Sequence, residues 1–340
     1  MNSVVLFIAG GSGTRFWPVS KRNFPKQYIK LFFDKSFIEM SYERVIEFVG
    51  KDNIFFILPE SQKGIFFRHM PYIKKDNVII EPFGNDTATA VAYATLRIKQ
   101  NFNNTIVYVM PSDHVIKDKE SFYTDLKLAK KYAEKNLLVT FGINPSFAST
   151  EYGYIEVNKE IERNRVFKVT SFREKPRKSL AEEFLKKGNF FWNSGIFVWT
   201  TETILEAFSM YATEIIESLN KYEPRVAYSR IKPISIDYAI LEKAQNIVLL
   251  KASFDWDDVG QWESVGKYLK KDEYSNAVLG NFYSEGTENI ISINRKGRNI
   301  VIGLKDVVVV KEGDDVLVMQ KGRSKSLKNI VKNINKEDEV

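Results

Sequence analysis

The chain has 340 residues, of which 44% are hydrophobic and 27% are charged. This composition is typical of a folded globular protein of about two domains, and it excludes a mainly disordered chain. The sequence contains no cysteine and two histidines, which excludes disulfides, thiolate metal sites, a cysteine nucleophile and a multi-histidine metal centre.

The chain carries 50 Lys and Arg residues against 43 Asp and Glu residues, for a net charge of +7. The basic residues are scattered, and no nucleic-acid-binding motif accompanies them, so we expect no nucleic acid partner. A mildly positive field favours small anionic substrates such as phosphates.

No apolar run approaches the roughly 18 residues that a membrane-spanning helix requires. The apolar segment Val4–Ala9 is shorter than the core of a signal peptide, and no basic residues precede it. We therefore interpret it as a buried first strand, and we expect a cytoplasmic protein without a membrane partner.

From the start of the chain to Phe141, short apolar runs alternate with stretches of helical spacing. Strands that alternate with helices are typical of parallel pairing in an α/β layered sheet. The expected strands are Val4–Ala9, Ile54–Leu58, Val78–Ile80, Ile106–Met110 and Leu137–Phe141. The expected helices are Phe37–Val49, Thr87–Lys99 and Phe122–Glu134.

The middle of the chain has a more mixed pattern. The expected strands there are Tyr152–Val157, Val166–Phe172, Ile196–Trp199 and Ile247–Phe254. The expected helices are Ser179–Lys187, Thr203–Leu219 and Trp262–Leu269.

After Asp272, short apolar runs follow one another with turn residues between them, which predicts a small all-β unit. Turns are expected at Lys296-Gly297 and at Glu312-Gly313-Asp314, and a final helix at Ser324–Ile334. The expected strands are Ala277–Phe282, Ile290–Ile293, Ile300–Leu304, Val307–Val310 and Val316–Met319.

The segment Gly10-Gly11-Ser12-Gly13-Thr14-Arg15 directly follows the first expected strand. Glycines let the backbone approach a ligand closely, and successive N–H groups then bind phosphate oxygens. The spacing of a P-loop is absent, and Phe16 stands where the dinucleotide fingerprint needs a third glycine. Arg15 and Lys26 near this turn predict a polyphosphate site; the alternative is a tight turn with two solvated basic residues.

These residues, with Ser20 and Pro25-Lys26-Gln27, resemble the signature of the sugar-nucleotide pyrophosphorylases. Trp17-Pro18 and Pro25-Lys26-Gln27 resemble the mannose-1-phosphate guanylyltransferase branch of that family. Further similar blocks follow in family order as far as about residue 265. They are Glu81-Pro82, Thr87-Ala88, Pro111-Ser112-Asp113-His114, Phe141-Gly142-Ile143, Tyr152-Gly153-Tyr154-Ile155-Glu156, Arg173-Glu174-Lys175-Pro176, Phe191-Trp192-Asn193-Ser194-Gly195, Ser235-Ile236-Asp237-Tyr238 and Phe254-Asp255-Trp256-Asp257-Asp258-Val259-Gly260.

The resemblance implies a Rossmann-like, mostly parallel nucleotidyltransferase domain over residues 1–272, which binds GTP and a sugar phosphate. It implies a small left-handed β-helix-like domain with a terminal helix over residues 273–340. In this family that second domain helps dimer formation, so a homodimer is expected.

The activity that the resemblance implies is transfer of GMP from GTP to α-D-mannose 1-phosphate, which gives GDP-mannose and pyrophosphate. The attacking phosphate oxygen is ionised at neutral pH, so alignment and charge neutralisation are expected to carry the catalysis, without a strong general base. The alternatives are another sugar 1-phosphate or nucleotide, or a non-catalytic sugar-nucleotide-binding regulatory module.

The resemblance also assigns roles to residues. The implied catalytic residues are Arg15, Lys26, Asp113 and Asp258. The implied nucleotide contacts are Ala9, Gly10, Gly11, Gly13, Thr14, Arg15, Lys26, Glu81, Asp86, Thr87, Ser112 and Asp113. The implied sugar-phosphate contacts are Tyr152, Gly153, Glu174, Lys175, Asn193 and Asp258.

Mg²⁺ is the implied cofactor, held by Asp113 and Asp258, because hard oxygen ligands without nitrogen or sulfur suit this ion. Asp257 is a neighbouring competitor for the second ligand position. The chain departs from the family pattern at Asp86, in the base-binding segment, and at Glu151, beside the sugar. Trp192 and Trp199 are expected to be core aromatic residues.

Overall fold

A computed structural model describes residues 1–11 and 13–337; Ser12 of the glycine-rich turn and residues 338–340 lie outside the described residues. The chain divides into two compact units, each built from segments far apart in sequence. The first unit combines Met1–Gly10 with Ser41–Asp257, and the second combines Gly11–Met40 with Asp258–Val340. The division into domains 1–272 and 273–340 stays a prediction.

Among the described residues, the first unit contains a nine-stranded sheet in the order β3-β2-β1-β4-β8-β5-β9-β7-β6. Every strand except β7 and β8 runs in the same direction, so the predicted mostly parallel α/β sheet is confirmed. The strands are β1 (Ser3–Ile8), β2 (Ile54–Pro59), β3 (Val78–Glu81), β4 (Ile106–Pro111), β5 (Leu138–Ile143), β6 (Tyr154–Glu162), β7 (Val166–Arg173), β8 (Phe190–Thr200) and β9 (Ile247–Lys251).

The register of the parallel strands sets the position of the loops that follow them. Ile8 at the end of β1 pairs with Ile57 on one side and with Pro111 on the other. Pro59 at the end of β2 pairs with Glu81 at the end of β3. The carboxyl ends of β1 to β4 therefore lie at one edge of the sheet, the edge at which open α/β sheets bind ligands.

Two strand predictions in the middle of the chain need correction. The strand predicted at Ile196–Trp199 is longer, because β8 runs from Phe190 and pairs antiparallel with β4, β5 and β6. The strand predicted at Ile247–Phe254 ends at Lys251. It ends there because the backbone N–H of Ser253 donates to the buried carboxylate of Asp125 at 2.7 Å, outside the sheet ladder.

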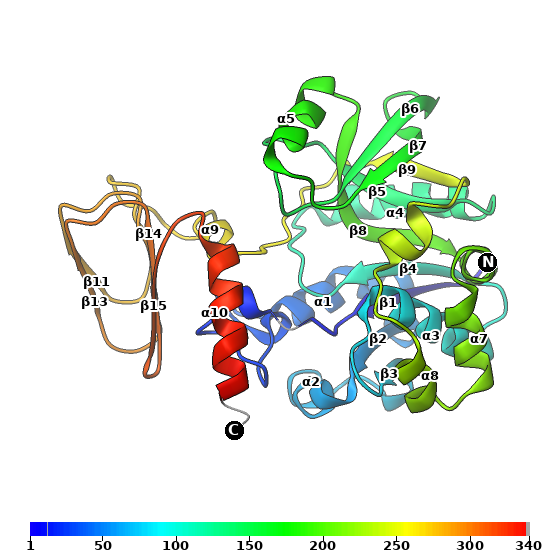
Figure 1. The fold of residues 1–340 in the computed structure, drawn as a ribbon, viewed down its shortest axis with the longest axis horizontal. Helices are drawn as coiled ribbons and strands as arrows, with labels where there is room; N and C mark the ends of the chain where they lie inside the picture. The colour runs from blue at the N-terminus through cyan, green and yellow to red at the C-terminus, as the bar shows by residue number, and fades with distance from the viewer. Residues whose placement is uncertain (12, 338–340) are drawn as a thin grey trace. The chain divides into compact units, whose positions relative to one another are not determined.

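The helix predicted at Thr203–Leu219 is also wrong in part, because the helix is broken at Ala212. Its apolar spacing continues across the break, so the sequence pattern did not reveal it. The helices of the first unit are α1 (Phe37–Val49, whose first turn belongs to the second unit), α2 (Lys63–His69), α3 (Asp86–Asn101), α4 (Lys119–Ala133), α5 (Lys178–Lys187), α6 (Thr201–Tyr211), α7 (Thr213–Lys221) and α8 (Pro224–Arg230), with a π-helical turn at Asp237–Leu241. In Figure 1, α5 lies with β6 and β7 at one end of this unit.

In the second unit, strands from successive turns of the chain pair in parallel, and the last two strands, β14 and β15, pair antiparallel. In two of the parallel pairs the partner positions lie 17 residues apart, as in Phe282–Asn299 and Ile291–Val308, and in a third pair they lie 14 apart, as in Ala277–Ile291. This repeat is typical of a β-helix-like domain, as expected. The strands are β10 (Ala277–Leu279), β11 (Phe282–Glu285), β12 (Ile291–Asn294), β13 (Asn299–Ile302), β14 (Val307–Glu312) and β15 (Asp315–Gln320). Figure 1 shows β14 and β15 between the β11–β13 pair and helix α10 (Ser324–Glu337).

Glycine turns separate the strands of this unit. The strand predicted at Ala277–Phe282 is divided at Gly280, which has φ 99° and leaves no room for a Cβ beside the carbonyl oxygen of Asn294. The predicted turns at Gly297 and Gly313 are confirmed by φ values of 83° and 61°. The predicted helix Trp262–Leu269 is shorter, since α9 ends at Val265.

No helix in the described part of the chain is long and apolar enough to cross a membrane.

Candidate active site

The first part of the glycine-rich turn lies over the ends of β2 and β3. Ala9 is buried, and its backbone N–H donates to the carbonyl of Ile57 at 2.9 Å. A Cβ on Gly10 would lie 3.3 Å from Cδ of Pro59 and 3.7 Å from Oε2 of Glu81. Gly10 thus packs tightly on Pro59, and the carboxylate of Glu81 lies within ordinary contact distance of it.

The second part of the turn packs against Lys26. Gly13 has φ 61°, and a Cβ there would lie 2.5 Å from both Cβ and N of Lys26. Ser20 donates from its hydroxyl to the carbonyl of Gly13, which fixes the turn further. Glycine is required at position 13 both for its left-handed conformation and for this close approach.

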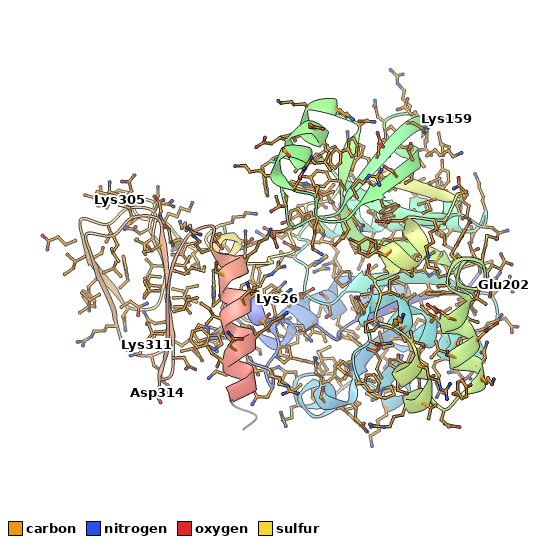
Figure 2. All side chains as sticks on the ribbon, viewed as in Figure 1. Lys26, Lys159, Glu202, Lys305, Lys311 and Asp314 are labelled. Carbon is orange, nitrogen blue, oxygen red and sulfur yellow. The ribbon has the colours of Figure 1, made fainter. Side chains whose placement is uncertain are left out.

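Lys26 is a buried cation with a fixed ammonium group. Its side chain is 5% exposed, and Nζ lies 5.7 Å from the ring centre of Phe16 and 5.2 Å from that of Phe37. Nζ donates to the backbone carbonyl of Asp258 at 2.6 Å. Two predicted catalytic residues are thus brought together inside the second unit. Figure 2 shows Lys26 beside helix α10, whereas Lys305, Lys311 and Asp314 lie farther from that helix in the same unit.

The segment after Asp258 is built to hold that residue's carboxylate. Oδ1 of Asp258 accepts from the backbone N–H of Gly260 at 3.1 Å, and a Cβ on Gly260 would lie 2.8 Å from Oδ2. Trp262 donates from Nε1 to the carbonyl of Trp17 at 3.0 Å and packs on Phe16. These contacts join the segment of Asp258 to the short helix that carries Arg15, Thr14–Phe16.

In the first unit, Asp113 follows β4 in a loop that α1 anchors. Ser41 donates from its hydroxyl to the carbonyl of Ser112 at 3.1 Å, and the buried guanidinium of Arg44 donates to the carbonyl of His114 at 2.8 Å. Burial lowers the pKa of Arg44 to about 10, so this side chain stays charged at neutral pH. Sequence reasoning missed both anchors, because an isolated Ser or Arg in a helix carries no motif.

The same loop pairs with the segment that ends at Asp257. Val115 and Asp257 exchange backbone hydrogen bonds of 2.8 and 3.0 Å. Oδ1 of Asp255 accepts from the backbone N–H groups of Lys117 and Asp118 at 2.8 and 2.7 Å. The backbone of Asp257 thus has a structural role, because it holds the loop that follows β4. Asp258, the other predicted metal ligand, is the next residue in the chain.

The predicted base-binding residues lie at the end of β3 and at the start of α3. Glu81 is 4% exposed, and burial raises its pKa to about 7. The hydroxyl of Thr87 accepts from the backbone N–H of Ile236 at 2.9 Å. Asp86 has φ 63°, and its carboxylate accepts from the N–H of Thr87 at 2.7 Å.

The predicted sugar-phosphate residues gather in the first unit. The backbone N–H of Asn193 donates to the carbonyl of Gly153 at 2.8 Å, and a Cβ on Gly153 would lie 2.6 Å from Oε2 of Glu174. Glu174 forms an ion pair with Lys175. The structure therefore brings Gly153, Glu174, Lys175 and Asn193 into one group.

Asp237 joins this group, although sequence reasoning gave it no role. Oδ1 of Asp237 accepts from Nδ2 of Asn193 at 2.8 Å, and the oxygen of the Asn193 amide accepts from the N–H of Gly195 at 3.0 Å. Burial and the nearby charge of Glu174 raise the pKa of Asp237 to about 6. Its place in the Ser235-Ile236-Asp237-Tyr238 block and in a π-helical turn, which often marks a functional site, was the available signal.

Tyr152 packs against Trp192 and Trp256, with ring centres 4.9 and 5.3 Å apart. Trp192 and Trp199 are buried, which confirms that they are core aromatic residues.

Comparison with known proteins supports this architecture. A family model described as nucleotidyl transferase matches residues 4–275. The chain belongs to the nucleotidyl transferase family. The family predicted from the sequence motifs is therefore confirmed, and the protein is an enzyme of the nucleotidyltransferase kind.

Curated relatives and a solved structure match this nucleotidyltransferase over nearly its whole length. It is 30% identical to a mannose-1-phosphate guanylyltransferase of Escherichia coli, over 97% of this chain and 75% of the relative. It is 32% identical to a protein of the same name from Salmonella montevideo, over 98% of this chain and 74% of the relative. A crystal structure from Thermus thermophilus, described as a mannose-1-phosphate geranyltransferase, superposes with a TM-score of 0.88 at 30% identity, over 98% of this chain and all of that one.

The contact between Gly13 and Lys26 leads to a stability prediction. Gly13→Ala should lower the free energy of unfolding by about 2 kcal/mol or more, because alanine is strained at this φ and its Cβ would collide with Lys26. Gly11→Ala is the matched control, since a Cβ there meets no described atom within 4 Å. Urea denaturation of both variants measures the difference, and equal stability of the two would contradict this role of Gly13.

The raised pKa of Asp237 leads to a prediction about pH. The unfolded carboxyl titrates near 3.8 and the folded one near 6, so the folded chain holds the proton more tightly between these values. The contribution of Asp237 to the free energy of unfolding is therefore greatest below pH 4 and falls as the pH rises through 6. The stability of the wild type relative to Asp237→Asn should fall by about 2 kcal/mol from pH 4 to pH 7 in urea denaturation. If the stability of the wild type relative to Asp237→Asn stays constant or rises with pH, the raised pKa of Asp237 is contradicted.

Proposed function

We propose that this nucleotidyltransferase is a mannose-1-phosphate guanylyltransferase, which transfers GMP from GTP to α-D-mannose 1-phosphate. The names of relatives that match it at 30% to 32% identity over nearly its whole length support this activity. The observation that carries the proposal is the buried residue Lys26: its backbone and Cβ lie against the glycine turn at Gly13, and its ammonium group donates to the carbonyl of Asp258. A buried cation beside a phosphate-binding turn is suited to neutralise polyphosphate charge.

The proposed reaction is an exchange between phosphate oxygens. An ionised oxygen of the sugar phosphate attacks the α-phosphorus of GTP, and the bond from that phosphorus to the bridging oxygen of the β-phosphate breaks. The electron pair leaves on pyrophosphate, so no proton has to be moved by a side chain. The N–H groups of the glycine turn and the guanidinium of Arg15 would hold the β- and γ-phosphates, and Lys26 would neutralise the developing charge.

The group around Asn193 suits recognition of a sugar phosphate. The carboxylates of Glu174 and Asp237 would accept hydrogen bonds from sugar hydroxyl groups, and the amide of Asn193 is held between Asp237 and Gly195. Lys175 offers a cation to the sugar's phosphate. A fixed array of acceptors and donors of this kind aligns the attacking oxygen, and alignment is the main catalytic requirement here.

We propose Mg²⁺ as the cofactor, with Asp113 and Asp258 as its protein ligands. The donor set fits, because both residues offer hard carboxylate oxygens and this ion is commonly bound by one or two carboxylates together with substrate phosphates and waters. When bound, the ion would supply charge neutralisation at the α-phosphate.

We also propose a cytoplasmic homodimer. Ile300 and Ile302 on β13 and Val316 and Val318 on β15 are exposed apolar side chains on strands of the second unit. Burial of such side chains against a second copy of the chain would be favourable.

The activity is tested with the four nucleoside triphosphates and a panel of sugar 1-phosphates, by measuring pyrophosphate release. GTP with mannose 1-phosphate should give the highest kcat/KM. Arg15→Ala should lower kcat by about 10²–10³ without unfolding the chain, because a charge contact to the leaving group is lost. Lys159→Ala removes an exposed cation from β6 and is the matched control. A higher kcat/KM for another nucleotide or sugar would replace the proposed substrate pair.

The metal assignment has its own test. EDTA should abolish activity and Mg²⁺ should restore it. Asp113→Asn and Asp258→Asn should each raise the Mg²⁺ concentration that is needed and lower maximal turnover. Asp257→Asn should do much less, because Asp257 holds the loop after β4 through its backbone atoms. Equal, mild effects of the three substitutions would show that Asp113 and Asp258 have structural roles and do not bind the metal.

A further inference from the structure

Glu81 is a buried carboxylate at the edge of the sheet where open α/β sheets bind ligands. It ends β3, at the edge of the sheet where the parallel strands finish, and it is 4% exposed. Its Oε2 atom lies toward Gly10, 3.7 Å from the position that a Cβ would take on that glycine. A buried carboxylate is costly unless its oxygens accept hydrogen bonds.

The other carboxylate oxygen accepts from Tyr228. This tyrosine lies on α8, is 1% exposed, and donates from its hydroxyl to Oε1 of Glu81 at 3.0 Å. Its ring meets Phe83 and Tyr93 edge to face, with ring centres 5.8 and 5.7 Å away. The hydroxyl is therefore fixed by packing on two sides, which directs Oε2 rather than Oε1 toward the turn.

The hydrogen bond from Tyr228 also affects the charge of Glu81. Burial raises the pKa of Glu81 to about 7, and the donated hydrogen bond acts in the opposite direction by stabilising the ionised form. Among the described residues, Tyr228 of α8 and Tyr93 of α3 are titratable groups that interact with Glu81, and Arg97 and Glu223 act on Tyr93. Near neutral pH the carboxyl group of Glu81 is thus close to the midpoint of its titration. A small change in the stabilisation of the ionised form then changes the fraction of the group that is charged.

Guanine presents two donors on one edge, N1–H and the exocyclic amino group. An ionised carboxylate accepts from both, whereas a protonated carboxyl group has lost acceptor capacity and presents an O–H donor. We propose that Tyr228 is a positioning residue for guanine recognition: its hydroxyl keeps Glu81 ionised and directs the carboxylate toward the glycine-rich turn. This inference rests on the proposed function, since it assigns the base specificity of the same site.

The experiment compares GTP with inosine triphosphate, which keeps N1–H but lacks the amino group. The two nucleotides have the same phosphates, so the ratio of their kcat/KM values cancels the titration of the triphosphate. In the wild type, this ratio should rise with pH through about 7. In Tyr228→Phe, the rise should move up by about one pH unit, so that the ratio is about fivefold lower at pH 7 and recovers as the pH rises above about 8.

Two further variants make the result specific. Glu81→Gln should give a low ratio that does not change with pH, and adding Tyr228→Phe to it should change the pH profile no further. Tyr108→Phe is the matched control, because it also removes the hydroxyl of a buried tyrosine in the first unit. The partner of that hydroxyl is the backbone carbonyl of Leu126, at 3.5 Å, and not Glu81. This variant should leave the pH profile of the ratio unchanged.

A purely structural role for Tyr228 would lower kcat/KM equally for both nucleotides and at every pH, and that result would overturn the proposal. An unchanged profile in Tyr228→Phe would overturn it as well. Absence of pyrophosphate release by the wild type with every sugar phosphate would instead refute the proposed function. In that case, calorimetric binding of GTP and inosine triphosphate to the same variants across the same pH range tests Tyr228 separately, with the same expected shift in the affinity ratio.

Discussion

The parallel pairing of β1 with β2 on one side and β4 on the other is the constraint on which the first unit's candidate site depends. It places the ends of these strands at one edge, so that Gly10 and Asp113 leave the sheet there, and Pro59 aligns Glu81 with them. Each of these strands is buried on both faces, which explains why they appear in the sequence as continuous apolar runs. A slip of β1 by one residue would exchange the side chains of its two buried faces and move the glycine turn.

The second unit shows how a small residue can determine the position of a buried cation. The absence of a side chain at Gly13 allows Lys26 to lie against the turn, and the carbonyl of Asp258 then accepts from its ammonium group. Lys26 is buried beside two aromatic rings, so its charge lies in a medium of low polarity, where it would act more strongly on a bound phosphate than an exposed lysine would.

Buried carboxylates recur as fixed hydrogen-bond acceptors in the first unit of this nucleotidyltransferase. Asp125 accepts from Ser253 and Arg165 and ends β9, Glu81 accepts from Tyr228, and Asp237 accepts from Asn193. In Glu81 and Asp237, burial raises the pKa toward neutral pH, so partner hydrogen bonds decide how much of the ionised form is present. Recognition of a base or a sugar at these positions would therefore be sensitive to residues that touch no ligand.

The sequence by itself determined the α/β class, the first strands and helices, the turns at Gly297 and Gly313, and the family, because apolar periodicity, glycine positions and short motifs are local properties. Only the tertiary structure decided that β8 extends to Phe190 and lies between β4 and β5. It also decided that β9 ends where the backbone N–H of Ser253 donates to Asp125. The bonds of Tyr228 to Glu81 and of Asp237 to Asn193 likewise join residues that are far apart in the chain. The physical reason is that strand order, buried hydrogen bonds and shifted pKa values depend on which distant segments pack together. Apolar spacing shows that a residue is buried, but it does not show which partner it is buried against.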